Sequence, residues 1–268
     1  MKSGKSTVRL FGRPPFKIAV LHGGPGAPGY MAPVARELSR IRGILEPLQT
    51  GETVEKQIQE LHQQLMQTGE APFTLIGSSW GAVLALFTAA RYPDIIAKII
   101  LIGSAVFDSA SSAQIHQTRM SRLTPEQKQQ YDEIEKQIES ADSQSKADLF
   151  KKWGELFSRL DSFDPIDHKD ETIEVQPQIF NRVWNDFVNL RDKPHCLKED
   201  FSKIKCPLVI IHGDYDPHPL AGIQPFLENC VENVRTYILE KCGHYPWLEK
   251  YARDKFYNLV VNEIVDDC

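Results

Sequence analysis

Short apolar runs alternate with amphipathic stretches along most of the chain. Runs of apolar residues predict strands at 16–21, 43–47, 73–76, 98–102, 207–211 and 234–239. In other stretches apolar residues repeat about every 3.6 positions, which predicts helices at 30–41, 53–66 and 247–261. Strands that alternate with helices form parallel βαβ units, and helices cover both faces of a parallel sheet. We therefore expect an α/β fold with a mostly parallel sheet flanked by helices.

The stretch from 105 to 203 has a different pattern. It is rich in Gln, Glu, Lys, Ser and Asp, and its apolar residues keep helical spacing without a strand-like run. We expect a helical cap or lid inserted between two strands of the sheet, so that residues 1–104 and 204–268 form the core. Four aromatic residues are expected to form the insertion's own core: Trp153, Phe157, Trp184 and Phe187. The alternative is that some of them line a substrate pocket.

Composition narrows the class of partner. The 268 residues carry a formal net charge of −5, which argues against nucleic-acid binding, because such proteins favour clustered Lys and Arg. No apolar run reaches about 18 residues, so we expect no membrane span. The first residues lack the long apolar segment of a secretory signal. The expected partner is a small molecule, with no role for nucleic acid or membrane.

The cysteines indicate a reducing compartment. Their number is odd, they are widely scattered, and no C-x-x-C occurs, so neither a disulfide framework nor a zinc site is predicted. The five are Cys196, Cys206, Cys230, Cys242 and Cys268. Reduced thiols and the lack of a secretory signal predict a cytoplasmic protein.

A serine lies at a predicted turn between a strand and a helix. The segment Gly77-Ser78-Ser79-Trp80-Gly81 follows the apolar run 73–76 and precedes the apolar run 82–87. G-x-S-x-G in this setting is typical of a nucleophile elbow, in which the glycines permit close backbone approach. Ser79 would be exposed at the carboxyl end of a strand, with the positive end of the next helix beneath it. Ser79 is therefore the candidate nucleophile.

A serine hydroxyl needs a positioned base, which a carboxylate in turn orients. Asp216 follows the strand predicted at 207–211, and His244 follows the strand predicted at 234–239. Both positions lie past strand ends, where open parallel sheets place their sites. Asp214 and Asp108 remain alternatives for the acid.

The motif His22-Gly23-Gly24-Pro25-Gly26, together with the elbow, resembles the proline iminopeptidase branch of the α/β-hydrolase superfamily. The resemblance covers residues 16–103 and 204–268 and implies the α/β-hydrolase fold. It leaves the insertion uncovered, because the iminopeptidase cap motifs are lacking there. The leading hairpin of the family is either shortened or reduced to Thr7–Phe11. The second strand lacks the common Asp-x-x-Gly turn.

The resemblance implies a role for each candidate residue. Ser79 would be the nucleophile, His244 the general base and then acid, and Asp216 the residue that orients the imidazole. The oxyanion hole would be formed by the backbone N–H groups of Gly24 and Trp80. His22 is expected to be structural, with its ring bonded to the surrounding loop, and no metal ligand is predicted.

These features together predict a serine hydrolase that cleaves a small carboxylic ester or amide through an acyl-enzyme, without cofactor or metal. One alternative is an aminopeptidase of the proline iminopeptidase type, which would act on a short peptide. Another is a non-catalytic ligand-binding receptor on the same fold. A third is acyl transfer to an acceptor other than water.

Overall fold

The computed structural model describes residues 7–140 and 143–265. Within these residues the strands are β1 (Val8–Phe11), β2 (Phe16–Leu21), β3 (Gly43–Pro47), β4 (Phe73–Ser78), β5 (Ile96–Ile102), β6 (Leu208–Gly213) and β7 (Val234–Leu239). They form one sheet in the order β1-β3-β2-β4-β5-β6-β7. Strand β1 pairs antiparallel with β3, and the other pairs are parallel. The predicted α/β fold with a mostly parallel sheet is confirmed.

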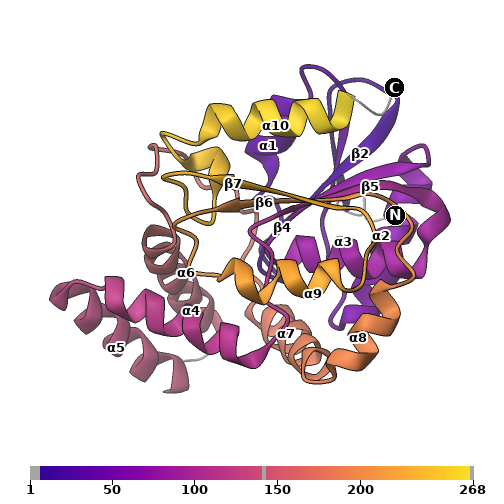
Figure 1. Cartoon of the computed structure of the whole chain (residues 1–268). Coiled ribbons are helices and arrows are strands. Elements are labelled where there is room, and N and C mark those ends of the chain that lie inside the picture. The colour runs from indigo at the N-terminus through magenta and orange to yellow at the C-terminus, as the bar shows by residue number, and fades with distance from the viewer. Residues whose placement is uncertain (1–6, 141–142, 266–268) are drawn as a thin grey trace, which may run out of the picture.

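Helices cover both faces of this sheet. The helices that flank it are α1 (Ala32–Leu38), α2 (Val54–Thr68), α3 (Trp80–Arg91), α8 (Pro194–Phe201), α9 (Gln224–Glu228) and α10 (Arg253–Val265). Helices α1 and α10 lie on one face, and α2, α3, α8 and α9 lie on the other (Figure 1). Consecutive residues of β2 point to opposite faces, so Ala19 joins the core under α2 and α3, whereas Val20 joins the core under α1 and α10. Because helices cover both faces of the sheet, the central strands are buried on both sides and consist of continuous apolar runs.

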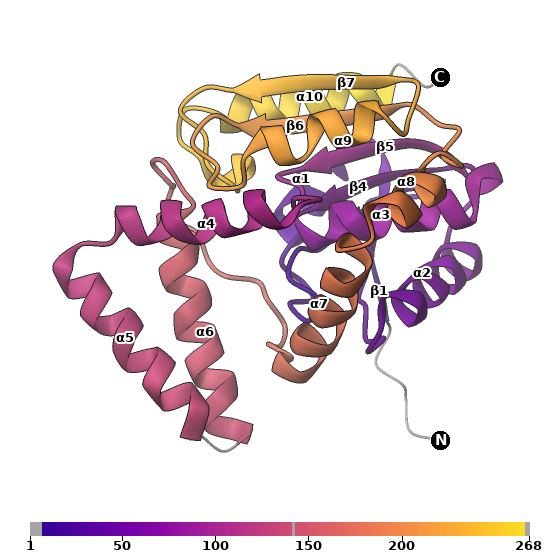
Figure 2. The ribbon, with the colours of Figure 1, turned by 60° about the horizontal axis from the view of Figure 1, so that its bottom comes forward.

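The insertion between β5 and β6 consists of two parts that pack differently. Besides α8, which flanks the sheet, its helices are α4 (Ser109–Arg122), α5 (Pro125–Ser140), α6 (Ser143–Leu160) and α7 (Pro177–Arg191). Helices α4, α5 and α6 form an arm that projects beyond the carboxyl ends of the strands (Figure 2). The arm has a small apolar cluster of its own around Tyr131, Leu156 and Leu160. Helix α7 packs on the main core through Val183 and Phe187.

The four aromatic residues expected to form one core are therefore divided. Trp153 and Phe157 pack in the arm. Phe187 is buried in the main core, where its ring contacts that of Trp80 edge to face, with 5.7 Å between the ring centroids. Trp184 packs beside Phe187. The expectation of a single insertion core was wrong, because helical spacing shows that a face is apolar without showing which surface it meets.

Two predicted helices have different bounds. The helix expected at 30–41 is shorter, since α1 begins at Ala32 and ends at Leu38. The helix expected at 247–261 is a 3₁₀ turn at Pro246–Leu248, followed by α10 from Arg253. Glu249 interrupts it because this residue forms a β-bridge with Pro165, and its buried carboxylate accepts backbone N–H groups.

The start of the chain and Cys268 lie outside the described residues. The four cysteines that the structure describes are free thiols. None of the helices in the described ranges combines the length and the apolar character needed to cross a bilayer.

Candidate active site

The strand, turn and helix predicted around Ser79 are present. Strand β4 ends at Ser78, α3 begins at Trp80, and Ser79 between them has φ +52° and ψ −113°. A β-carbon on Gly77 would lie 2.2 Å from the carbonyl oxygen of Gly81, so only glycine fits there. The serine therefore occupies a backbone region that side chains rarely adopt, and packing on both sides holds it there.

Asp216 and His244 are in direct contact. Nδ1 of His244 lies 2.8 Å from Oδ2 of Asp216, and both side chains are buried. The two alternatives for the acid are engaged elsewhere. Asp108 accepts the N–H of Ser111 at the start of α4, and Asp214 accepts a backbone N–H in the turn before His244. Among the three acids weighed, only Asp216 contacts the imidazole within the described structure.

The end of β5 connects this pair to the serine. The backbone N–H of Ser79 donates to the carbonyl oxygen of Ile102 at 2.9 Å. The next residue, Gly103, has φ +50°, and a β-carbon there would lie 2.8 Å from Nδ1 of His244 and 3.0 Å from Oδ2 of Asp216. The segment Ile102–Gly103 therefore contacts the elbow with one residue and the His–Asp pair with the next.

The electrostatics of the pair favour an ionised carboxylate. Burial alone would raise the pKa of Asp216, but the charges and hydrogen bonds of the His244 and His218 rings hold it well below its usual range. Burial would also lower the pKa of His244. The negative charge and hydrogen bond of Asp216 outweigh this effect, so the pKa of His244 is raised.

The loop that follows β2 lies against the serine. A β-carbon on Gly23 would be 3.1 Å from the β-carbon of Ser79. Gly24 follows with φ +51°. Within the described part of the chain, neither the N–H of Gly24 nor that of Trp80 is paired with an acceptor. Two backbone donors beside the serine are what an oxyanion hole requires.

His22 holds this loop in place. Its Nδ1 lies 3.0 Å from the carbonyl oxygen of Gly23, and its Nε2 lies 3.4 Å from the N–H of Gln49. Burial lowers the pKa of His22 to about 4, so the ring is neutral near pH 7. A neutral ring with its proton on Nδ1 satisfies both contacts, which fits the structural role expected for His22.

The segment between α6 and α7 covers the same loop. The N–H of Gln176 donates to the carbonyl oxygen of Gly26, and the N–H of Ile173 donates to that of Pro28, both at 2.8 Å. A β-carbon on Gly26 would lie 2.6 Å from the carbonyl oxygen of Gln176. The insertion therefore fixes the position of the loop that carries the Gly24 N–H.

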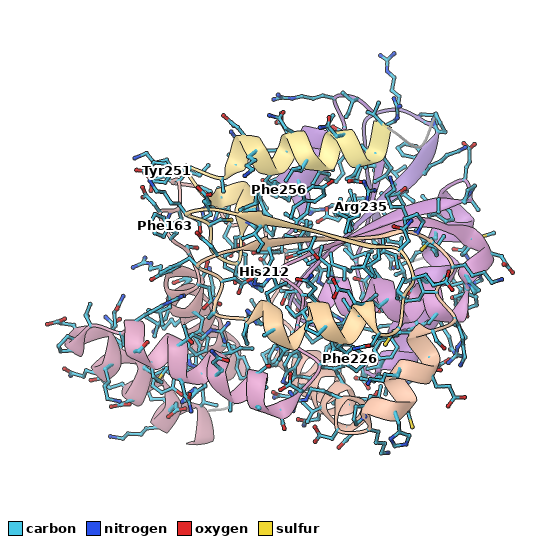
Figure 3. All side chains as sticks on the ribbon, viewed as in Figure 1. Phe163, His212, Phe226, Arg235, Tyr251 and Phe256 are labelled. Carbon is cyan, nitrogen blue, oxygen red and sulfur yellow. The ribbon has the colours of Figure 1, made fainter. Side chains whose placement is uncertain are left out.

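The turn that carries His244 is held by two acids that the sequence did not indicate. The N–H of His244 donates to the carbonyl oxygen of Asp161, and the N–H of Gly243 donates to the carboxylate of Glu249, both at 2.8 Å. The Asp161 carboxylate is buried and pairs with Arg119 of α4 at 2.8 Å. Glu249 also accepts the backbone N–H groups of Phe163 and Asp164. Figure 3 labels Phe163 at the edge of the molecule.

A cluster of three possible metal ligands occurs where none was expected. Ligand atoms of Asp216, His218 and His244 lie within 4.8 Å of one another. The loop after β6 brings His218 beside the pair. Both histidine Nδ1 atoms lie 2.8 Å from carboxylate oxygens of Asp216, a hydrogen-bond distance. A metal ion would have to displace both contacts.

Comparisons with known proteins agree with this architecture. A model of the alpha/beta hydrolase fold family matches residues 46–251, well over half of the chain. The crystal structure of VinJ is similar over 97% of this chain and 94% of that one, with a TM-score of 0.68 and 21% identity. A structure from work on carboxylesterases of the thaumarchaeon Nitrososphaera gargenis covers 96% and 93%, with a TM-score of 0.65 and 17% identity.

Proline iminopeptidase of Mycobacterium smegmatis is also among the similar structures. It covers 97% of this chain and 94% of its own, with a TM-score of 0.62 and 17% identity. At these identities the likeness is one of fold. No curated protein sequence matches this chain.

Proposed function

Because the chain belongs to the α/β-hydrolase fold family, we propose that it is a serine hydrolase that cleaves a small carboxylic ester or amide. The observation that supports the proposal most is the hydrogen bond of 2.8 Å between Asp216 and His244. This pair borders Gly103, and the preceding residue, Ile102, accepts the N–H of Ser79. Nucleophile (Ser79), acid (Asp216) and base (His244) then occur in the chain order typical of this fold.

In the proposed mechanism Ser79 Oγ attacks the carbonyl carbon of the substrate, and Nε2 of His244 takes the hydroxyl proton. The carbonyl oxygen becomes an oxyanion, which the N–H groups of Gly24 and Trp80 stabilise. Losing one such donor typically costs about 10²–10³ in rate. Asp216 keeps the His244 proton on Nδ1 and stabilises the imidazolium.

The second half of the reaction reverses these roles. His244 donates its proton to the leaving alcohol or amine as the carbonyl bond to it breaks, which leaves an acyl ester on Ser79. A water then attacks that ester while His244 again accepts a proton. His244 returns this proton to Ser79 Oγ as the bond between Oγ and the acyl group breaks, and the acid product leaves. The reaction uses side chains and backbone donors of this chain, and neither a cofactor nor a metal takes part.

Two model substrates test the proposal and separate its two forms. We expect turnover of p-nitrophenyl acetate if the substrate is a simple ester. Preferential turnover of proline p-nitroanilide would instead support the aminopeptidase alternative. The matched control is Ser79→Ala prepared in the same way, which removes any contribution from contaminating esterases. Lack of turnover of both substrates, with a correctly folded protein, would favour a ligand-binding receptor.

The raised pKa of His244 leads to a prediction about pH. The base must be neutral to accept the serine proton, so activity falls as pH drops through this pKa. Because the pKa is raised, the acid limb of kcat/KM should have its midpoint above 6.5, the ordinary value of histidine. Measurement in a constant-ionic-strength buffer series, with circular dichroism at each pH, checks this. A midpoint at or below 6.5 in a protein that stays folded would contradict the assignment of His244.

A further inference from the structure

A second histidine contacts the other side of the acid. Nδ1 of His218 lies 2.8 Å from Oδ1 of Asp216, and the backbone N–H of His218 donates to the same oxygen at 2.9 Å. The other oxygen, Oδ2, lies 2.8 Å from Nδ1 of His244. The carboxylate is therefore fixed from both ends, one by each histidine.

The two rings are also stacked. The centroids of His218 and His244 are 4.2 Å apart, with 19° between the ring planes. The buried ring of His218 therefore covers one face of the His244 ring. Rotation of the His244 ring about its side-chain bonds would break this contact as well as the hydrogen bond to Asp216.

We propose that His218 is a positioning residue for the serine hydrolase reaction: its Nδ1–H fixes the Asp216 carboxylate, and its ring fixes the orientation of the His244 imidazole. The inference rests on the proposed function, because it assumes that His244 is the base. His218 itself touches no reacting atom. Its effect on catalysis passes through Asp216 and His244.

The protonation state of His218 agrees with the donor role. Burial and the neighbouring His244 lower the pKa of His218 to about 4, although Asp216 acts in the opposite direction. At neutral pH the ring is therefore uncharged and carries a single proton. With that proton on Nδ1, His218 donates a hydrogen bond to Oδ1 of Asp216, which would otherwise lose one of its donors.

Other charged groups around the pair must be considered when its titration is interpreted. His212 of β6, labelled in Figure 3, lies 4.0 Å from Asp216 Oδ2. Asp161 raises the pKa of His244, and Arg119 of α4 lowers it. These groups remain in place when only His218 is changed, so a shift caused by His218 can be separated from theirs.

Two substitutions separate the donor from the ring. His218→Phe keeps a ring that can stack on His244 but removes the hydrogen bond. His218→Asn places an amide N–H near the position of Nδ1 and removes the ring. The matched control is His62→Phe. His62 lies in α2, and its ring stacks on that of Tyr92 with 4.0 Å between the ring centroids, so this variant also replaces a stacked histidine by phenylalanine.

The experiment measures the histidine pKa values by ¹⁵N NMR in the full-length protein, together with the pH profile of kcat/KM on p-nitrophenyl acetate. Without the donor on Oδ1, the negative charge of Asp216 is less stabilised by hydrogen bonds. The carboxylate then interacts more strongly with the imidazolium of His244 and stabilises it. His218→Phe should therefore raise the His244 pKa and the acid limb by about 0.5–1 unit, and lower kcat about tenfold with little change in KM. His218→Asn should restore the pKa to within about 0.3 unit of the unmodified protein. His62→Phe should leave both unchanged.

The inference is overturned if His218→Phe leaves the His244 pKa unchanged, or if His218 of the unmodified protein carries its proton on Nε2. The tautomer is read from the unmodified protein, so it decides even if a variant fails to fold. If no substrate is turned over, the proposed function fails, while the NMR titration still reports whether His218 sets the pKa of His244.

Discussion

Replacing Ser79 with alanine is expected to lower kcat on the preferred substrate by about 10⁴–10⁶-fold, because it removes the oxygen that forms the acyl-enzyme bond in the proposed mechanism. The folded state should be unaffected, since the hydroxyl is not needed for the backbone N–H of Ser79 to bond Ile102. Steady-state rates and urea unfolding of the same preparation test both parts. A variant that keeps a tenth of the activity would mean that Ser79 is not the nucleophile.

A glycine at the same position adds a prediction about stability. Ser79 has φ +52°, a conformation that costs non-glycine residues about 1–3 kcal/mol. Ser79→Gly should therefore be inactive. Its free energy of unfolding should exceed that of Ser79→Ala by about 1 kcal/mol, a difference that already includes the larger entropy of glycine in the unfolded chain. A Gly variant less stable than the Ala variant would show that the elbow is not strained.

The second large effect is expected from Gly81→Ala. The added β-carbon would lie 2.3 Å from the carbonyl oxygen of Leu21 and 2.7 Å from that of His22. Both are backbone atoms and cannot rotate away, so α3 and the end of β2 must separate. We expect a loss of about 3 kcal/mol in the free energy of unfolding. Activity should fall by about 10²–10³-fold, since the loop that carries the Gly24 N–H begins at His22.

A control for this substitution is available in α6. Gly154 is exposed in the middle of that helix, and a β-carbon there would meet no atom within 4 Å. Gly154→Ala should raise stability by about 0.5–1 kcal/mol through helix propensity alone. Urea unfolding of the two variants compares them directly. Equal stability of Gly81→Ala and the unmodified protein would contradict the close packing described for the elbow.

The sheet and the elbow could be predicted from sequence because local pattern determines them. Continuous apolar runs mark strands buried on both faces, as in β4, whichever partners they have. Thr53 as the first residue of a helix was also a local signal, and its side chain accepts the N–H of Lys56 at the start of α2. The two glycines of the elbow indicated a tight turn because no other residue fits there.

The remaining features depend on contacts between distant segments. Glu249 reads as part of a helix in the sequence, yet its carboxylate binds backbone N–H groups of the insertion, more than eighty residues earlier. The contact of His218 with Asp216 needs a particular loop geometry, and an acidic turn can adopt several. The different partners of Phe157 and Phe187 depend on how the helices of the insertion are placed. No single-residue signal indicates such placement.

The central claim is that Ser79 is an activated nucleophile, and labelling with a fluorophosphonate probe tests it most directly. The probe forms a covalent bond only with a serine whose proton can be taken by a nearby base. We predict stoichiometric labelling of the unmodified protein, mapped to the peptide that contains Ser79, and none in Ser79→Ala. An unlabelled folded protein, or labelling that persists in Ser79→Ala, would contradict the claim.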